Sequence, residues 1–149
     1  MSEHRANLHW ERGSQAFTYE SYGRDHVWRF PGGVEVPASS APEFRGNPAC
    51  VDPEAALVAA LSSCHMLTFL AIAARKRLVV DSYGDDAVGY LEKNADGKLA
   101  VTRVVLRPKV VFGEGTSVSK QDLDRLHHRS HEECFIANSV KTEVTVEPA

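Results

Sequence analysis

DPEAALVAALSSCHMLTFLAIAAR, residues 52–75, is predicted to form one long helix. Its first residues follow the usual pattern of a helix N-terminus. Asp52 can accept the N-cap hydrogen bond, Pro53 suits the first helical position, and the Glu54 carboxylate faces the positive end of the helix dipole. We expect the helix to end at about Arg75.

This predicted helix is apolar on nearly every side. Over residues 55–74 its only ionisable side chains are Cys64 and His65, so we expect it to be buried all round. A run of this length could also span a membrane, but alanine supplies much of it and polar side chains interrupt it. We therefore interpret it as a core helix. A chain of this size cannot easily cover such a helix alone, which suggests a dimer in which a second copy helps to cover it.

The composition is that of an ordinary folded protein with a single domain, residues 1–149. The chain has 43% hydrophobic and 25% charged residues, which excludes disorder and collagen-like repetition. Its 17 Lys and Arg residues against 20 Asp and Glu residues give a formal net charge of -3. This balance offers no electrostatic basis for binding nucleic acid or an anionic membrane.

The N-terminal sequence and the cysteine count both bear on location. The first residues, MSEHRANLHWERG, have no apolar stretch after a basic start, so we expect no secretory signal and a cytoplasmic location. There, Cys50, Cys64 and Cys134 would stay mostly reduced, and an odd, sparse count indicates no structural disulfide framework. Cys50 lies in a proline-rich loop and is interpreted as an incidental thiol.

The remaining pattern predicts strands on both sides of the long helix and one further helix, which is an α+β order. Ser117 or Ser119 can cap the second helix, which should run to about Cys134. The segment from Pro37 to Asp52 has three prolines and little periodicity, so it is expected to be irregular. Strands are predicted at residues 7–12, 16–22, 26–30, 85–92, 99–112 and 140–147.

Cys64 and Cys134 lie on different predicted helices and are the main candidates for chemistry. Taken alone, each is most simply a small buried hydrophobe. Two cysteines on separate elements can, however, form a disulfide if their Cα atoms come within about 4.4–6.8 Å. Reactivity also needs a nearby cation, because apolar surroundings raise the pKa of a thiol.

Arg45 is the best-placed cation for this purpose, since it lies in the loop just before the long helix. Glu54 lies about 15 Å from Cys64 along a helix, so it does not reach the sulfur and could instead hold an arginine. A simpler interpretation makes Glu54 a first-turn helix acid and Arg45 a solvated loop charge. Spacing alone slightly favours the simpler interpretation.

HHRSHEEC, residues 127–134, is a second cluster of possible ligands. His127, His131 and Cys134 fall on one helical face, which would suit zinc. No second ligand pair at a zinc spacing accompanies them, and histidines such as His128 near a helix C-terminus also complement the dipole. A zinc-binding or small-ligand-binding protein is therefore the alternative function class, and a purely structural dimer is a third.

Two segments, DPEAALVAALSSCHMLTFL at residues 52–70 and HEECFIANSVKTEVTVEP at residues 131–148, resemble the OsmC/Ohr family of organic hydroperoxide reductases. The resemblance covers nearly the whole chain. Its most specific features are the acid ahead of the first cysteine and the second cysteine just before the closing strand. Phe135, where a proline commonly follows the second cysteine, and His65, directly after the first, depart from the family pattern and suggest a separate branch.

The resemblance implies roles for individual residues. Cys64 matches the peroxidatic thiol, Cys134 matches the resolving thiol, and Glu54 matches the family's glutamate. The family's arginine matches Arg45 in the placement of OsmC-type members or Arg12 in that of Ohr-type members, and we favour Arg45.

The resemblance also implies a fold, an activity and partners. The expected fold is an intertwined homodimer in which antiparallel sheets wrap around a long buried central helix and a second helix. The expected activity is thiol-dependent reduction of organic hydroperoxides to alcohols, through a Cys64 sulfenic acid and a Cys64–Cys134 disulfide. A dithiol reductant, for which the family suggests a lipoyl group, would restore the thiols, with no metal or organic cofactor.

The apolar residues next to Cys64 allow two interpretations. They could line a pocket that favours alkyl or fatty-acid hydroperoxides over hydrogen peroxide. Helical spacing makes core packing the better interpretation for most of them. The residues concerned are Met66, Leu67, Phe69 and Leu70.

Overall fold

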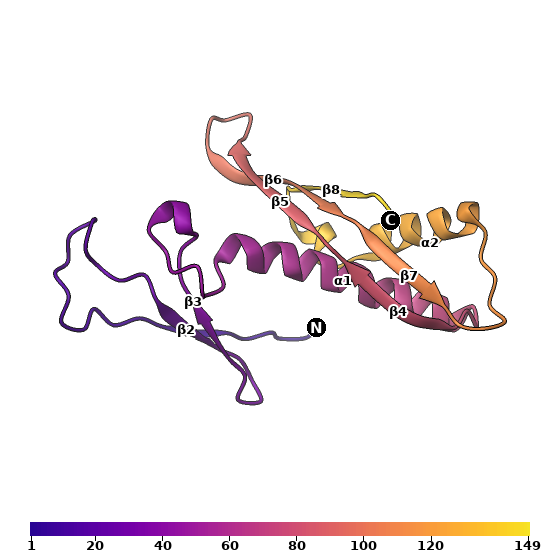
Figure 1. The fold of residues 1–149 in the computed structure, drawn as a ribbon, viewed down its shortest axis with the longest axis horizontal. Coiled ribbons are helices and arrows are strands. Elements are labelled where there is room, and N and C mark those ends of the chain that lie inside the picture. Colours follow the sequence, from indigo (N-terminus) through magenta and orange to yellow (C-terminus); the bar gives the residue numbers. More distant parts are fainter. The chain divides into compact units, whose positions relative to one another are not determined.

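A computed structural model describes all residues of the chain, 1–149. Helices and strands follow one another in the predicted α+β order (Figure 1). The chain divides into two compact units, Met1–Ala56 and Leu57–Ala149, and each is described by itself.

The first unit holds a three-stranded antiparallel sheet in the order β1-β2-β3. The predicted strand at residues 16–22 is wrong, because this segment turns on itself: the Thr18 carbonyl accepts hydrogen bonds from the backbone nitrogens of Ser21 and Tyr22. A strand extends instead into the segment expected to be irregular, where Pro37 is tolerated because β3 is an edge strand. The elements are β1 (Asn7–His9), β2 (His26–Arg29), β3 (Glu35–Ala38) and the short helix η1 (Pro42–Phe44).

The long helix α1 (Pro53–Arg75) begins and ends as predicted. The Asp52 carboxylate accepts a hydrogen bond of 2.8 Å from the backbone nitrogen of Ala55, which is the expected N-cap bond. By length and composition α1 is the one helix that could cross a membrane. In this fold, one face of α1 packs into the core of the second unit.

The second unit is dominated by a long hairpin that closes at a turn around Gly97, whose φ of 74° suits glycine. Each arm is interrupted halfway, so the hairpin has four strands. The predicted strand at residues 99–112 is divided into two, and the predicted strand at residues 85–92 corresponds to one half of the first arm. The other half of that arm, residues 80–85, is a strand that the sequence did not predict. At the interruption the Asp85 carboxylate accepts hydrogen bonds from the Arg107 backbone nitrogen (2.6 Å) and the Ser62 hydroxyl (2.5 Å). Strand β4 pairs with β7, and β5 pairs with β6. The elements are β4 (Val80–Asp85), β5 (Val88–Lys93), β6 (Leu99–Leu106) and β7 (Pro108–Phe112).

The second helix, α2 (Lys120–Glu133), is capped by Ser119, whose hydroxyl accepts a hydrogen bond of 3.1 Å from the backbone nitrogen of Asp122. After the short helix η2 (Ala137–Ser139), strand β8 (Glu143–Val146) joins the sheet in the order β5-β6-β8. Because α2 carries the chain back across the unit, β8 runs parallel to β6. This sheet is therefore mixed, whereas the expected sheets were antiparallel.

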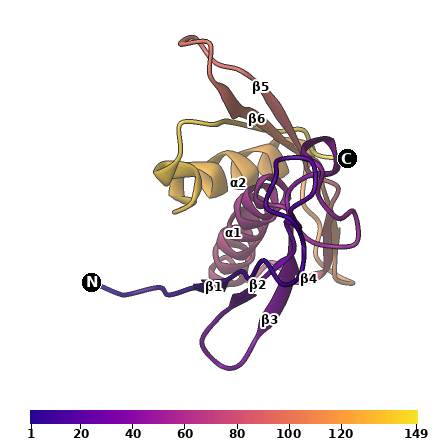
Figure 2. The same ribbon diagram turned by 90° about the vertical axis from the view of Figure 1, so that its left-hand side faces the viewer.

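The core of the second unit lies on one face of α1. Figure 2 shows both helices on the same side of the hairpin. One cluster joins α1, α2, β4 and β7 around Phe69 and Leu126, and another joins α1 to β6 and β8 around Leu61 and Val104. Within a single chain the expectation that α1 is buried all round is wrong, because these layers cover only one side of it. Its exposed residues include Ala59, Ser63, Leu67, Ala71 and Ala74.

Candidate active site

Cys64 and Cys134, which lie far apart in the sequence, have their thiols side by side in the second unit. Cys64 lies within α1 and is half-buried, whereas Cys134 directly follows α2 and is 1% exposed. Both are free thiols. The structure therefore brings together the two predicted sulfur residues, one from α1 and one from the end of α2.

The surroundings of Cys134 keep it protonated. Burial, followed by the neighbouring Cys64 thiol, raises its pKa to about 11, although a hydrogen bond of 3.4 Å from the backbone nitrogen of Ala137 to the sulfur acts in the opposite direction. At neutral pH Cys134 is consequently a thiol and not a thiolate. Cys64, and not Cys134, lines the pocket that lies beside the two sulfurs.

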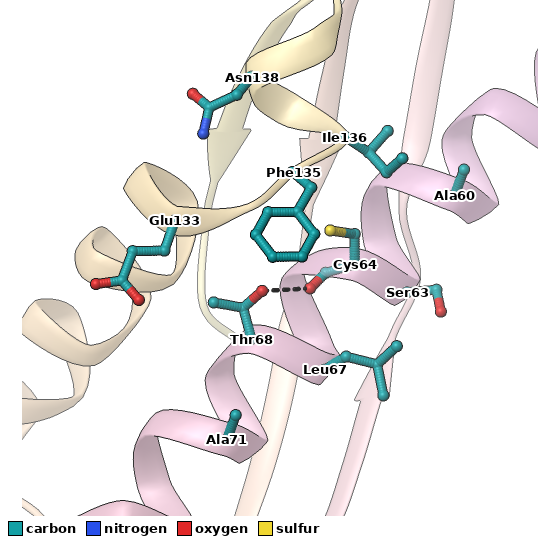
Figure 3. A pocket seen from close by; sticks show the side chains of 10 residues that line it. All are labelled: Ala60, Ser63, Cys64, Leu67, Thr68, Ala71, Glu133, Phe135, Ile136 and Asn138. Carbon is teal, nitrogen blue, oxygen red and sulfur yellow. Dashed lines mark hydrogen bonds between the residues drawn. The ribbon is translucent and has the colours of Figure 1, made fainter. Parts of the chain in front are cut away.

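This pocket has a volume of about 780 Å³ and is mostly apolar. Figure 3 shows the Cys64 side chain pointing from α1 toward the segment that carries Phe135 and Ile136. The Thr68 hydroxyl, one polar group in the wall, donates a hydrogen bond of 2.8 Å to the Cys64 carbonyl. The lining residues are Ala60, Ser63, Cys64, Leu67, Thr68, Ala71, Glu133, Phe135, Ile136 and Asn138.

The apolar residues near Cys64 divide between this pocket and the core. Leu67 lines the pocket and is 60% exposed, whereas Phe69 is fully buried in the core. Phe135, which the sequence identifies as a departure from the family pattern, lines the pocket and is 81% exposed. An exposed aromatic ring beside a thiol provides a surface for an apolar ligand.

Arg45 and Glu54, the predicted cation and its partner, both belong to the first unit. Arg45 follows η1 in a left-handed backbone conformation with φ of 62°, and its guanidinium lies 5.6 Å from the centre of the Tyr19 ring. Glu54 is half-buried in the first turn of α1, and within one chain it forms no ion pair with Arg45. Arg12, the alternative, donates a hydrogen bond of 3.2 Å to the carbonyl of Gln15.

Sequence reasoning missed Arg24, the buried arginine of the first unit. Its guanidinium lies 3.6 Å from the centre of the Tyr22 ring and 5.1 Å from that of Tyr19, and it donates hydrogen bonds to the carbonyls of both tyrosines. No carboxylate pairs with it. The two tyrosines shortly before the arginine were the only available signal, and they do not by themselves predict that their rings enclose the guanidinium.

His65 and His127 form a buried pair that sequence reasoning also missed. His65 Nε2 and His127 Nδ1 lie 3.0 Å apart, and the rings are nearly parallel at 10°. Burial, the largest cause, lowers the pKa of each to about 4, so both rings are neutral at pH 7. The two residues are far apart in the sequence, so no local spacing could indicate the pairing.

The predicted zinc alternative finds no support in this arrangement. No group of three or more His, Cys, Asp or Glu side chains is placed to hold a metal ion. His127 is bonded to His65, and the Cys134 sulfur accepts a hydrogen bond from Ala137. His128 is exposed, and its Nε2 lies 3.2 Å from the Glu132 carboxylate.

Comparison with known proteins places this geometry in a wider group. The profile of a family described as OsmC-like protein matches residues 46–149. Among solved structures, the chain is similar to an OsmC-like protein of unknown function from Vibrio cholerae O1 biovar eltor, with 54% identity, a TM-score of 0.96 and 100% of each chain covered. No match was found among curated protein sequences.

Two more distant structures carry functional names. One is an organic hydroperoxide resistance protein OsmC from Legionella pneumophila, at 15% identity and a TM-score of 0.73, covering 99% of this chain and 96% of that one. The other is the organic hydroperoxide resistance protein OhrB of Bacillus subtilis, at 14% identity and a TM-score of 0.67, covering 99% and 98%. At these identities the likeness establishes a shared fold.

Proposed function

The chain belongs to the OsmC-like protein family, and from this premise we propose that it is a cysteine-based peroxidase that reduces organic hydroperoxides to alcohols. The family and its hydroperoxide resistance members connect it with redox chemistry and the response to oxidative stress. The single observation that carries the proposal is the pairing of a pocket-lining thiol, Cys64, with a buried thiol, Cys134.

The proposed reaction begins at Cys64. Its thiolate attacks the outer oxygen of the hydroperoxide, so that an S–O bond forms, the O–O bond breaks, and the departing alkoxide takes up a proton to become the alcohol. Cys64 is thereby oxidised to a sulfenic acid. The Cys134 thiol then loses its proton and attacks the Cys64 sulfur, which releases water and leaves a disulfide.

The different surroundings of the two sulfurs support this order of events. A peroxide can reach Cys64 through the pocket, whereas Cys134 is buried and protonated at neutral pH. A buried thiol with a raised pKa is a poor nucleophile toward external peroxide. It can still attack a sulfenic acid that forms directly beside it.

The thiolate and the departing oxygen both require a positive charge. We assign this role to Arg45, oriented by Glu54, with Arg12 as the alternative. The free guanidinium of Arg45, which pairs with no carboxylate within the chain, supports the assignment. Substitution of Arg45 by Lys and of Arg12 by Lys, compared for the rate of Cys64 oxidation, separates the two.

The apolar pocket supports organic over inorganic peroxides as substrates. Leu67, Phe135 and Ile136 can bury an alkyl or aryl group next to Cys64, and hydrogen peroxide has no such group. The remainder of the proposal is a cytoplasmic enzyme with one domain over residues 1–149. It needs no metal or organic cofactor and is recycled by a dithiol such as a lipoyl group.

A homodimer is also part of the proposal. The exposed face of α1 carries small and apolar side chains. Leu67 and Ala71 line the Cys64 pocket, whereas Ala59 and Ala74 lie outside it, and a second copy could cover this outer part of the face. Such a partner would extend the burial of α1 toward what its composition predicts.

Treating the reduced protein with one equivalent of cumene hydroperoxide tests the function. We expect digestion and mass spectrometry to identify a Cys64–Cys134 disulfide peptide and one equivalent of alcohol. Cys64→Ser should abolish alcohol formation, while Cys50→Ser, the matched control at the third cysteine, should leave it unchanged. Alcohol formation by folded Cys64→Ser protein at the wild-type rate would refute the proposal.

A further inference from the structure

We propose that the buried His65–His127 bridge is a positioning element for the disulfide, holding the helix end that carries Cys134 within reach of Cys64. The inference deepens the proposed function, on which its biological meaning rests. It concerns residues that touch neither the pocket nor a peroxide, since neither histidine lines the Cys64 pocket.

The bridge joins the two elements that carry the sulfurs. His65 directly follows Cys64 on α1, and His127 lies on the buried face of α2 that leads to Cys134. The contact between His65 Nε2 and His127 Nδ1, at 3.0 Å, is the only hydrogen bond between α1 and α2. Residues seven apart on a helix lie on the same face, so His127 and Cys134 both face α1.

Cys134 is attached by hydrogen bonds both to α2 and to the segment that follows it. Its backbone nitrogen donates a hydrogen bond of 3.3 Å to the carbonyl of His131, in the last turn of the helix. The chain then continues into η2, where Asn138 donates to the Cys134 carbonyl at 3.0 Å. A displacement of α2 along or away from α1 therefore carries the Cys134 sulfur with it.

The bridge is rigid because the rings are packed on several sides. His65 and His127 are 1% and 2% exposed. The Phe69 ring stacks on His127 at 4.6 Å between centroids, and Tyr83 approaches the same ring edge-on at 6.5 Å. A hydrogen bond in such surroundings is directional, and neither ring can turn without losing its packing.

The polar groups that face the histidine pair form no hydrogen bonds with it. Asp85 and Tyr83 approach from β4, and Asp124 and His131 from α2, and none of them forms a hydrogen bond with either ring. The outer ring nitrogens, His65 Nδ1 and His127 Nε2, are buried without partners. The bridge is thus a single hydrogen bond in which one ring donates an N–H to the other, and no further hydrogen bond connects it to Cys64.

The stability of the disulfide toward reduction measures this positioning without any peroxide. In a Cys50→Ser background, oxidised dithiothreitol takes two electrons and two protons from Cys64 and Cys134 and becomes reduced dithiothreitol. The equilibrium constant for this exchange reports how well the fold places the two sulfurs for bonding. It can be measured even if the chain proves not to be a peroxidase, so the two proposals fail separately.

Matched substitutions isolate the hydrogen bond from packing. The amide of glutamine occupies nearly the position of a histidine Nε2, and that of asparagine nearly the position of Nδ1, so His65→Gln can keep the bond while His65→Asn is too short to reach His127. Ile72→Val removes a buried methyl group from the same face of α1, and His128→Gln removes an exposed histidine from α2.

We expect His65→Asn and His127→Leu to lower the equilibrium constant about tenfold, and His65→Gln to stay within about threefold of the wild-type value. Ile72→Val should lower the melting temperature without moving the constant, and His128→Gln should change neither. If His127→Leu does not fold, the comparison of His65→Asn with His65→Gln decides alone. Equal constants for these two folded variants would overturn the proposal.

Discussion

Phe135 lines the pocket around Cys64 and is largely exposed to solvent. Apolar area removed from water contributes about 25 cal/mol per Å², so a half-covered aromatic ring contributes on the order of 1–2 kcal/mol to an apolar substrate. Hydrogen peroxide gains nothing from the same ring. A change at Phe135 should therefore alter the preference between the two peroxides without altering the reactivity of the Cys64 sulfur.

Phe135→Ala should therefore change selectivity. We expect kcat/KM for cumene hydroperoxide to fall about tenfold, and kcat/KM for hydrogen peroxide to change by less than about twofold. Stopped-flow measurement of Cys64 oxidation with both peroxides checks this. The control is Asn138→Ala, which removes a more polar side chain from the same pocket wall. An equal fall for both peroxides would show that Phe135 acts on the thiol and not on the substrate.

The buried histidines predict how stability depends on pH. Burial lowers the pKa of His65 and of His127 from 6.5 to about 4. Below pH 6.5 the unfolded chain binds protons that the folded chain does not. The free energy of unfolding should therefore decrease as the pH falls from 6.5 toward 4, by up to about 1.4 kcal/mol per pH unit for each histidine, and level off below 4.

Urea unfolding between pH 7 and pH 4 measures this dependence, and the double variant His65→Gln/His127→Asn, which has no histidine to titrate at these positions, should reduce the slope. His128→Gln serves as the control, because it removes an exposed histidine from the same helix. The prediction fails if the double variant and the wild type lose stability in parallel.

At the scale of elements, both helices depend on their caps. Asp52→Ala removes the acceptor of the 2.8 Å bond from the Ala55 nitrogen, and we expect it to lower the free energy of unfolding by about 1 kcal/mol. Asp52→Asn keeps an acceptor oxygen and should lose about half as much or less. Denaturant titration of the two variants provides the test. Equal losses would mean that the carboxylate acts through its charge and not through the cap.

The same caps explain what the sequence could predict. The Asp52–Pro53–Glu54 start and the Ser119 cap are local signals, and the bounds of α1 and α2 agree with them. Strands lack such signals. The predicted strand at residues 16–22 is a turn, and at the break the Asp85 carboxylate accepts a hydrogen bond from the backbone nitrogen of Arg107 in the opposite arm of the hairpin.

The candidate site shows the same division. Cys64 and Cys134 could be identified because sulfur residues are few and their spacing resembles a known family. The His65–His127 pair could not, since the two residues are separated by 62 positions and meet only in the packed fold. Tertiary packing determines which side chains of different elements meet, and the hydrophobic periodicity of each segment does not contain this information.

At the scale of the whole molecule, the burial of α1 in a single chain is less than its apolar composition predicts. The helix has apolar residues all round, yet the hairpin and α2 cover only one side of it. Exposed apolar helix faces of this kind are usually interfaces. A symmetric pair of chains would bury two such faces at once, because a two-fold axis brings the same patch of each copy together.

Ala59→Lys tests this explanation, because Ala59 lies on the exposed face of α1 but outside the Cys64 pocket. We expect the wild type to sediment as a dimer at micromolar concentration, and Ala59→Lys to weaken association by at least about tenfold, since each copy would bury an unpaired ammonium group in the interface. Asp96→Lys, at the exposed turn of the hairpin, adds a lysine away from α1 and should leave the dimer unchanged. Sedimentation velocity with circular dichroism separates dissociation from unfolding. A wild-type chain that sediments as a monomer, or an Ala59→Lys chain that dimerises as tightly as the wild type, would rule out this face as the interface.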